Sequence, residues 1–309
     1  MPRSFTSEEK IQGFERYGAL LSGSRAVLVT RASGVEAVAI ALVLRRRRER
    51  RRRGRETDDD LRRHMATLAH NAGIFVTCAE SLDAFVDSAI DAYLRSDLVL
   101  LWDGNVGRQF DGCLEHLTAR KRDLPTCAAY AVEPYYFFGQ PGYDAVNPYE
   151  HKTILVVSSH VDSMRSQVDS GNYLRCFAPY SVFRDCVFKF VRPPQTQAGN
   201  HGGRDWRANL PRLVEDVRSA GEFDIALVSC GGYGQVVTDY IHRDLGKSAV
   251  YVGGPLQLFF GVMGKRWTDN QVIAGHRRRN RRFWIEPLES DRPPNAEGVG
   301  EIFEAGCYW

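Results

Sequence analysis

Glycine and hydroxyl side chains follow several apolar segments of the chain, in positions where they could bind a phosphate. The clearest case is the segment Cys230–Gly234 (CGGYG), which comes after the apolar run Phe223–Ser229 and before a helix predicted over Gln235–Leu245. Glycines at such a junction let a ligand approach the backbone closely, and a helix N-terminus offers N–H groups to an anion. The candidate phosphate-binding residues are therefore Cys230, Gly231, Gly232, Tyr233 and Gly234. The alternative is a tight turn that needs glycine for its positive φ.

Two serines occupy an equivalent position after another predicted strand. Ser158 and Ser159 follow the apolar run that begins at Lys152. Their hydroxyl groups would bind phosphate or sugar oxygens, or would cap the next helix.

A third glycine turn follows the strand predicted over Ser248–Val252. Gly253 and Gly254 begin a segment that ends with the cations Lys265 and Arg266. Two cations after such a turn would neutralise a diphosphate, with Trp267 beside them to stack a base. The alternative is a core helix over Leu256–Val262 with an ordinary basic end.

The segment Arg31–Glu36 (RASGVE) follows the predicted strand Arg25–Thr30. Glu36 is a candidate general base or metal ligand, and the Arg31 guanidinium would clamp an anion or orient that carboxylate. A buried Arg31–Glu36 pair with a structural role is the alternative.

The order of the elements predicts an α/β protein with a Rossmann-like, mostly parallel sheet flanked by helices, because short apolar strands, glycine turns and helices alternate. Residues 1–150 are expected to form an N-terminal lobe with an arginine-rich insertion at 45–60, and residues 151–309 a nucleotide-binding lobe, together one catalytic unit. The aromatic and proline-rich segment Tyr130–Tyr149 is expected to form an ordered loop wall beside a cleft. The other predicted elements are the strands Asp97–Trp102 and Cys186–Val191 and the helices Ala37–Leu44, Leu61–Ala72, Ser81–Leu94 and Trp206–Ala220.

Charge is distributed unevenly along the 309 residues. The tract 45–55 holds nine arginines and one glutamate, while the remainder has 32 Lys and Arg against 37 Asp and Glu. A tract of this kind can bind nucleic acid or anionic lipid, but it has no interleaved aromatic residues, and the acidic cluster Asp58–Asp60 follows it. We therefore expect a solvated helix face or insertion that partly neutralises itself, and nucleic acid is disfavoured as a partner.

Other protein classes are disfavoured by the composition. The N-terminus has no apolar core of the signal-peptide kind, and the apolar stretch Ala26–Leu44 carries Arg31 and Glu36 at its centre, so no membrane span is expected. Seven cysteines without a CxxC pattern indicate reduced thiols and a cytoplasmic protein. Neither a zinc-ligand set nor a GxSxG nucleophile motif is present.

Several segments together resemble a family associated with the GT-D type of glycosyltransferase fold. They are DIALVSCGGYG, LGKSAVYVGGPLQLFFGVMGKRW and the terminal GCYW, with a weaker likeness over Arg25–Glu36. RASGVE is similar to the Arg-x-Gly-Asp-Gly-Glu turn of GT-D enzymes, in which an Asp-x-Glu pair serves a metal and a sugar nucleotide. Arg31 and Glu36 match that turn, whereas Gly34 stands where the turn has Asp, and Val35 where it has Gly.

The resemblance implies a hexosyl or pentosyl transferase of glycan biosynthesis, which moves a sugar from a UDP- or GDP-sugar to a hydroxyl of a carbohydrate acceptor. It implies Glu36 and Arg31 as catalytic residues, and Asp103 is expected to substitute for the Asp that Gly34 replaces, so that Glu36 and Asp103 are candidate ligands of Mn²⁺ or Mg²⁺. A non-catalytic protein that binds a nucleotide or sugar phosphate is the alternative.

Overall fold

Seven strands form one sheet in the order β3-β2-β1-β7-β6-β4-β5 in the computed structural model, which describes residues 4–53, 58–140 and 147–294. Every neighbouring pair is parallel. The strands are β1 (Leu28–Arg31), β2 (Leu98–Leu101), β3 (Thr126–Ala128), β4 (Thr153–Ser158), β5 (Val187–Val191), β6 (Ile225–Ser229) and β7 (Ser248–Tyr251). The predicted Rossmann-like α/β fold is confirmed.

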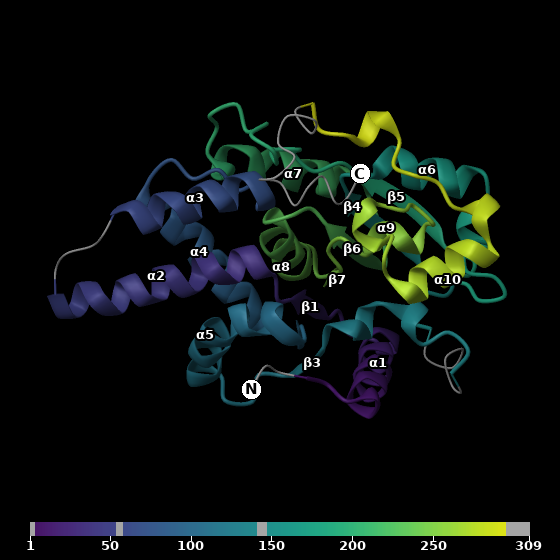
Figure 1. Ribbon diagram of the computed structural model, residues 1–309, viewed down its shortest axis with the longest axis horizontal. Helices are drawn as coiled ribbons and strands as arrows, with labels where there is room; N and C mark the ends of the chain where they lie inside the picture. Colours follow the sequence, from purple (N-terminus) through teal and green to yellow (C-terminus); the bar gives the residue numbers. More distant parts are fainter. Residues whose placement is uncertain (1–3, 54–57, 141–146, 295–309) are drawn as a thin grey trace.

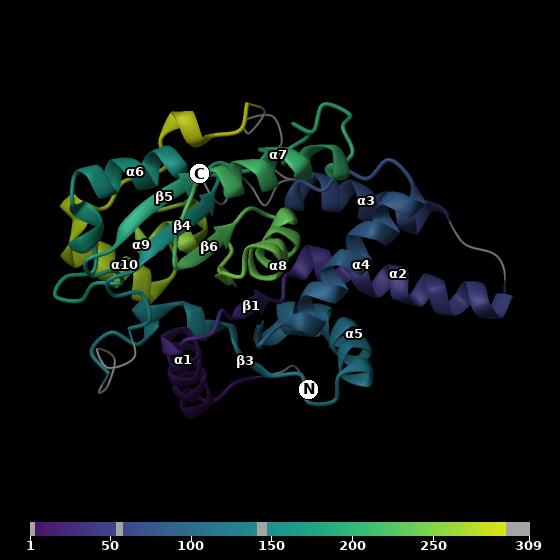
Figure 2. The same cartoon turned by 180° about the vertical axis from the view of Figure 1, so that it is seen from behind.

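Helices cover both faces of this sheet (Figures 1 and 2). One layer packs on the strand residues typified by Leu155 and Val157, and the other on the alternate residues Ile154 and Val156. The first layer consists of α2 (Gly34–Arg53), α3 (Asp58–Ala72), α4 (Ala79–Arg95), α5 (Gly104–Arg120), α7 (Trp206–Ser219) and α8 (Tyr233–Leu245). The second consists of α1 (Ser7–Ser22), α6 (Val161–Asp169), α9 (Leu256–Phe259) and α10 (Gln271–Arg279).

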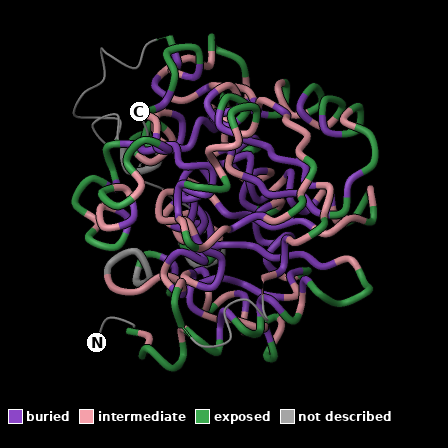
Figure 3. Tube along the Cα trace, turned by 90° about the vertical axis from the view of Figure 1, so that its right-hand side faces the viewer, coloured by how far each residue is buried: buried purple, intermediate pink, exposed green. Residues whose placement is uncertain are grey.

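The central strands are short runs of apolar residues because both of their faces are covered. All four residues of β1 and of β2 are buried, as parallel sheets require when helices lie on both sides. Figure 3 shows the buried segments gathered in the interior and the exposed ones around them.

The two predicted lobes contribute to the same sheet. Strand β1 lies between β2 and β7, and Leu28 and Val29 are aligned with Ala249 and Val250. The boundary at residue 150 falls in the connection between β3 and β4, and the strands before and after it belong to one continuous sheet.

The helix that begins at Gly34 continues through the arginine tract to Arg53. Its far end and the start of α3 project from the rest of the molecule (Figure 1). Arg47 is not merely solvated, because it forms ion pairs of 3.0 and 2.6 Å with Asp83 and Asp87 of α4. The proposed neutralisation by Asp58–Asp60 lies outside the described side chains.

Other elements differ from the prediction. Helices α1, α5 and α10 and the short strand β3 were not anticipated. Strand β1 ends one residue later than predicted, so Arg31 belongs to the strand itself. The helix predicted over Leu256–Val262 ends at Phe259 because Gly261 has a φ of +71° and lies against Cys176 and Gln167. Positions 141–146 of the aromatic segment and Cys307–Trp309 lie outside the described residues.

Candidate functional site

A cavity of about 1010 Å³ lies at the carboxyl edge of the sheet. Residues at or just after the ends of five strands line it: Arg31, Trp102, Ser159, Ser229 and Tyr251. Adjacent strands β4 and β6 send their connections in opposite directions, to β5 and to β7. In open parallel sheets, ligands bind at this edge, where the connections diverge.

The two sides of the cavity have different chemistry. One side is formed by a single face of α3, with Arg63, His64, Thr67 and Asn71. The other side comes from the connection after β3 and from the segment before α10, and its lining residues are Tyr130, Glu133, Tyr136, Arg266, Trp267 and Asn270. The expected loop wall beside a cleft is therefore confirmed for the described part of the aromatic segment.

Arg31 connects several elements at the bottom of the cavity. Its guanidinium donates to Glu133 at 3.1 Å and to the carbonyl of Val252, and it lies 4.0 Å from the centre of the Trp102 ring. Its own carbonyl accepts hydrogen bonds from Gln235 at 2.6 Å and Tyr93 at 3.2 Å. The side chain is consequently fixed in one orientation within a buried setting.

Glu133, the carboxylate paired with Arg31, was missed by the sequence reasoning. It is only 3% exposed, and its second oxygen accepts a hydrogen bond from Tyr135 at 2.6 Å. Burial raises the pKa of Glu133, while the nearby positive charge of Arg31 and the Tyr135 hydrogen bond oppose that rise. The sequence does hold one signal for this residue, because Glu133 is the single carboxylate within the aromatic stretch Tyr130–Phe138.

Glu36 lies in the first turn of α2 and lines the same cavity. It is 4% exposed, and the Ser33 hydroxyl donates to its carboxylate. The first i→i−4 bond of the helix joins the Ala37 N–H to the Ser33 carbonyl at 3.0 Å, so the N–H groups of residues 34–36 have no acceptor within the helix. This helix end presents its positive dipole to the cavity.

Asp103 occupies a different place from the one its predicted role requires. Its carboxylate accepts the Phe5 N–H at 3.0 Å and pairs with Lys10 at 3.3 Å, which joins α1 to the start of α5. It does not line the cavity that contains Glu36. These two carboxylates therefore do not fit a shared metal site, and the described residues contain no cluster of three or more His, Cys, Asp or Glu able to hold an ion.

The glycine loop, residues Cys230–Gly234, packs against the end of α3 and against β7. A Cβ at Gly232 would lie 2.3 Å from Ile74, and one at Gly234 would lie 2.2 Å from the Tyr251 ring. The Gly232 N–H donates to the carbonyl of Ala72 at 2.8 Å, so the C-terminal end of α3 covers the N-terminus of α8. Gly231, with φ of +55°, lines the cavity.

Cys230 and Tyr233, on either side of those glycines, are buried and outside the cavity lining. Burial, with the nearby Glu36 charge, raises the pKa of the Cys230 thiol, which is therefore protonated at neutral pH. The geometry at Cys230–Gly234 thus matches the tight-turn alternative more closely than an open phosphate loop.

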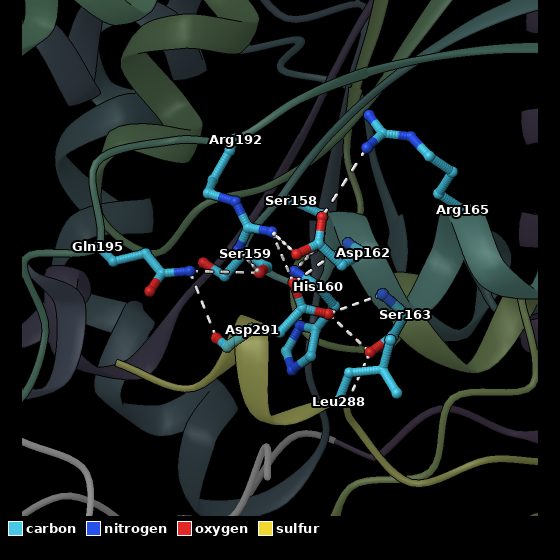
Figure 4. A network of polar contacts seen from close by, with 10 residues as sticks. All are labelled: Ser158, Ser159, His160, Asp162, Ser163, Arg165, Arg192, Gln195, Leu288 and Asp291. Carbon is cyan, nitrogen blue, oxygen red and sulfur yellow. Dashed lines mark hydrogen bonds and ion pairs between the residues drawn. The ribbon is translucent and has the colours of Figure 1, made fainter. Parts of the chain in front are cut away.

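A residue from the C-terminal part of the chain binds the N-terminus of α6, next to the two predicted serines (Figure 4). Asp291 accepts the backbone N–H groups of Asp162 at 3.1 Å and Ser163 at 2.8 Å, and it pairs with Arg192 at 2.8 Å. A carboxylate of the protein therefore takes the place at the α6 N-terminus where an external phosphate was expected. The intervening sequence gave no signal for this contact.

The two serines beside α6 have different surroundings. Ser158 is buried, and its hydroxyl accepts the N–H of His160 at 3.1 Å. Ser159 lines the cavity, and its carbonyl accepts a hydrogen bond from Arg192 at 3.0 Å.

The glycine turn after β7 and the segment that follows it contribute more to the cavity. Gly253 and Gly254 line it, and a Cβ at Gly253, where φ is +70°, would lie 3.4 Å from the Arg31 guanidinium. Arg266 and its neighbour Lys265 are both exposed, but only Arg266 lines the cavity. The structure thus brings together Arg31, Glu36, Ser159, Gly231, the Gly253–Gly254 turn and Arg266.

No protein-family model, curated protein or solved structure matches this chain. Within the described ranges, no helix has the length and apolar character needed to span a bilayer. The six described cysteines, Cys78, Cys113, Cys127, Cys176, Cys186 and Cys230, are free thiols.

The side chains of the cavity are suited to a polar, anionic ligand that also carries a ring. Guanidinium groups and a helix N-terminus favour phosphate oxygens. Two buried carboxylates can accept protons or hydroxyl hydrogens, and partly exposed aromatic rings can contact a sugar or a base.

Proposed function

We propose that the chain is a glycosyltransferase that binds a UDP- or GDP-sugar in this cavity and transfers the sugar to a hydroxyl of a glycan or another acceptor. One observation carries the proposal: the cavity joins the Arg31–Glu36 turn, which is similar to the GT-D turn, to Arg266 at the carboxyl edge of a Rossmann-like sheet. That edge is where nucleotides bind in related architectures.

The donor diphosphate would lie between the first turn of α2 and Arg266. The amide groups of residues 34–36 and the Arg266 guanidinium supply positive charge from two directions. This arrangement moves the phosphate site away from the N-termini of α8 and α6, which Ala72 and Asp291 occupy. Positive charge held in place before the reaction stabilises the departing diphosphate without reorganisation.

Glu36 is the proposed general base. It would take the proton of the acceptor hydroxyl as that oxygen attacks the anomeric carbon and the bond to the diphosphate breaks. Arg31 and Glu133 form a neutral pair beside it, so Arg31 acts here by holding the floor of the cavity in shape. No step is assigned to a metal, because Asp103, the second expected metal ligand, does not line the cavity with Glu36.

A non-catalytic protein that binds a nucleotide or sugar phosphate is the second candidate, and the burial of Glu36 favours it. A Glu36→Gln variant separates the two. A general base predicts a folded variant that binds nucleotide normally and transfers no sugar. A structural Glu36 predicts a lower melting temperature with unchanged ligand specificity.

The first test is a thermal-shift and calorimetric titration with UDP, GDP, CDP and their common sugars, with and without manganese. We expect one nucleotide family to stabilise the protein and its affinity to fall about tenfold or more in Arg266→Ala, which removes a charged contact. Lys265→Ala is the matched control and should bind as the wild type does. Absence of binding by every nucleotide, or equal losses in both variants, would refute the proposed donor site.

A further inference from the structure

Three partly exposed aromatic side chains form one section of the cavity: Trp102, Tyr130 and Tyr136, here called the aromatic wall. Many other tyrosines of the chain, such as Tyr93 and Tyr135, are fully buried. The wall is therefore a set of rings that the fold leaves partly in contact with solvent inside this cavity.

The rings of the aromatic wall meet at steep angles. Trp102 and Tyr130 have centroids 6.2 Å apart and planes inclined by 73°. Tyr130 and Tyr136 are 5.2 Å apart and inclined by 74°. These edge-to-face contacts make an angular surface, unlike the parallel faces that sandwich a flat base.

Neighbouring groups hold each ring in place. The Arg31 guanidinium lies over Trp102, and the Lys10 ammonium lies 4.2 Å from the centre of Tyr130. The Tyr136 hydroxyl accepts a hydrogen bond of 2.8 Å from Asn270. Rings fixed before a ligand arrives lose little conformational freedom on binding.

Polar groups surround the rings on the same side of the cavity. Glu133, Arg266 and Asn270 offer a carboxylate, a guanidinium and an amide. Burial raises the pKa of Tyr136 to about 12 and also raises that of Tyr130, so both hydroxyls stay protonated and can donate. A non-planar molecule with apolar faces and many hydroxyl groups matches this combination better than a flat heterocycle.

We infer that the aromatic wall is a sugar-ring subsite and that it binds the acceptor saccharide. The assignment of this saccharide as the acceptor rests on the proposed function, whereas the binding of a sugar ring does not. The wall and Glu36 line the same cavity, so an acceptor held here would share the cavity with the proposed base.

The test is a calorimetric titration of the full chain with methyl glycosides of glucose, galactose, mannose and N-acetylglucosamine and with their disaccharides. Uridine and guanosine serve as flat ligands without phosphate. We expect a saccharide to bind and its affinity to fall about tenfold in Tyr130→Leu, because the ring contact is lost. Tyr130→Phe, which keeps the ring, should retain most of the affinity.

Tyr136→Leu provides a second variant if Tyr130→Leu does not fold, and Tyr240→Leu, at a half-buried tyrosine of α8 outside the cavity lining, is the matched control. The inference is overturned if no saccharide binds, if the leucine variants bind saccharide normally, or if the nucleosides bind the wall instead. Saccharide binding that depends on the wall, in a protein that binds no nucleotide, would refute the transferase proposal and leave the subsite intact.

Discussion

Arg31 shows how much of the site depends on single residues with distant partners. It contacts Trp102, Glu133 and Val252 through its side chain and Tyr93 and Gln235 through its carbonyl. Removing it would leave Glu133 as a buried carboxylate without its ion pair, which is a costly state. The role of Arg31 is therefore first to organise the cavity, whatever ligand binds there.

His276, which lies outside the cavity lining, makes the stability of the protein depend on pH. It is 5% exposed, packs edge-on against Phe138 and Phe177, and has a lowered pKa because of burial and the nearby Arg279 charge. The unfolded chain therefore binds a proton at a higher pH than the native protein does. Stability is complete above about pH 6.5 and falls as the pH drops below that value.

The measurement for His276 is the free energy of unfolding between about pH 8 and pH 5, for the wild type and His276→Gln. The variant should lack this part of the acid dependence, so that the difference between the two proteins shrinks on acidification. Parallel curves would show that His276 does not carry the effect.

At the scale of elements, three helices begin at the same edge of the sheet but differ in what covers them. The carbonyl of Ala72 accepts an N–H at the N-terminus of α8, and Asp291 accepts N–H groups at the N-terminus of α6. The first turn of α2, in contrast, lines the cavity. A glycine turn or a pair of serines before a helix therefore does not by itself indicate a ligand site, because another group of the protein can occupy the helix N-terminus. The tertiary contact at each helix N-terminus decides which one can receive a ligand.

Gly232 tests this interpretation of the glycine loop. We expect Gly232→Val to destabilise the protein by about 1–3 kcal/mol or more, because the side chain would overlap Ile74. The loss should appear in the free energy of unfolding without any ligand. Gly275→Ala, in open space within α10, is the control and should be neutral or stabilising by about 0.5–1 kcal/mol. A Gly232→Val variant of normal stability that fails to bind nucleotide would restore the phosphate-loop interpretation.

At the scale of the whole molecule, the first and second halves of the chain share one sheet and two cores. Strand β1 pairs with β2 on one side and with β7 on the other, and each hydrophobic cluster contains residues from both halves. The cavity is likewise lined from both halves.

Fragments 1–150 and 151–309 should consequently fail to fold when each is produced alone, because each would expose one side of a central strand and half of each core. Circular dichroism and amide NMR dispersion of the two fragments test this expectation. A fragment with cooperative thermal unfolding would instead support independent lobes. Mixing the fragments is the positive control for complementation.

All strands but the three-residue β3, and most helices, were predictable from the sequence because apolar runs and helical spacing are local signals. The predicted strands at 97–102, 152–158 and 248–252 correspond to β2, β4 and β7. Helix α5 was missed because it begins at a glycine, Gly104, and its apolar residues are few, among them Phe110, Cys113 and Leu117.

The arrangement of the candidate site was decided by tertiary structure. Local spacing placed Arg31, Glu36, Gly253 and Arg266 near strand ends, and they do line one cavity. The pairing of Arg31 with Glu133 and the capping of α6 by Asp291 join segments 102 and 128 residues apart. Such contacts depend on how strands are ordered in the sheet, and periodicity in the sequence carries no information about that order. The sequence determined which chemical groups stand at the edge of the sheet, and packing determined which of them remain open to a ligand.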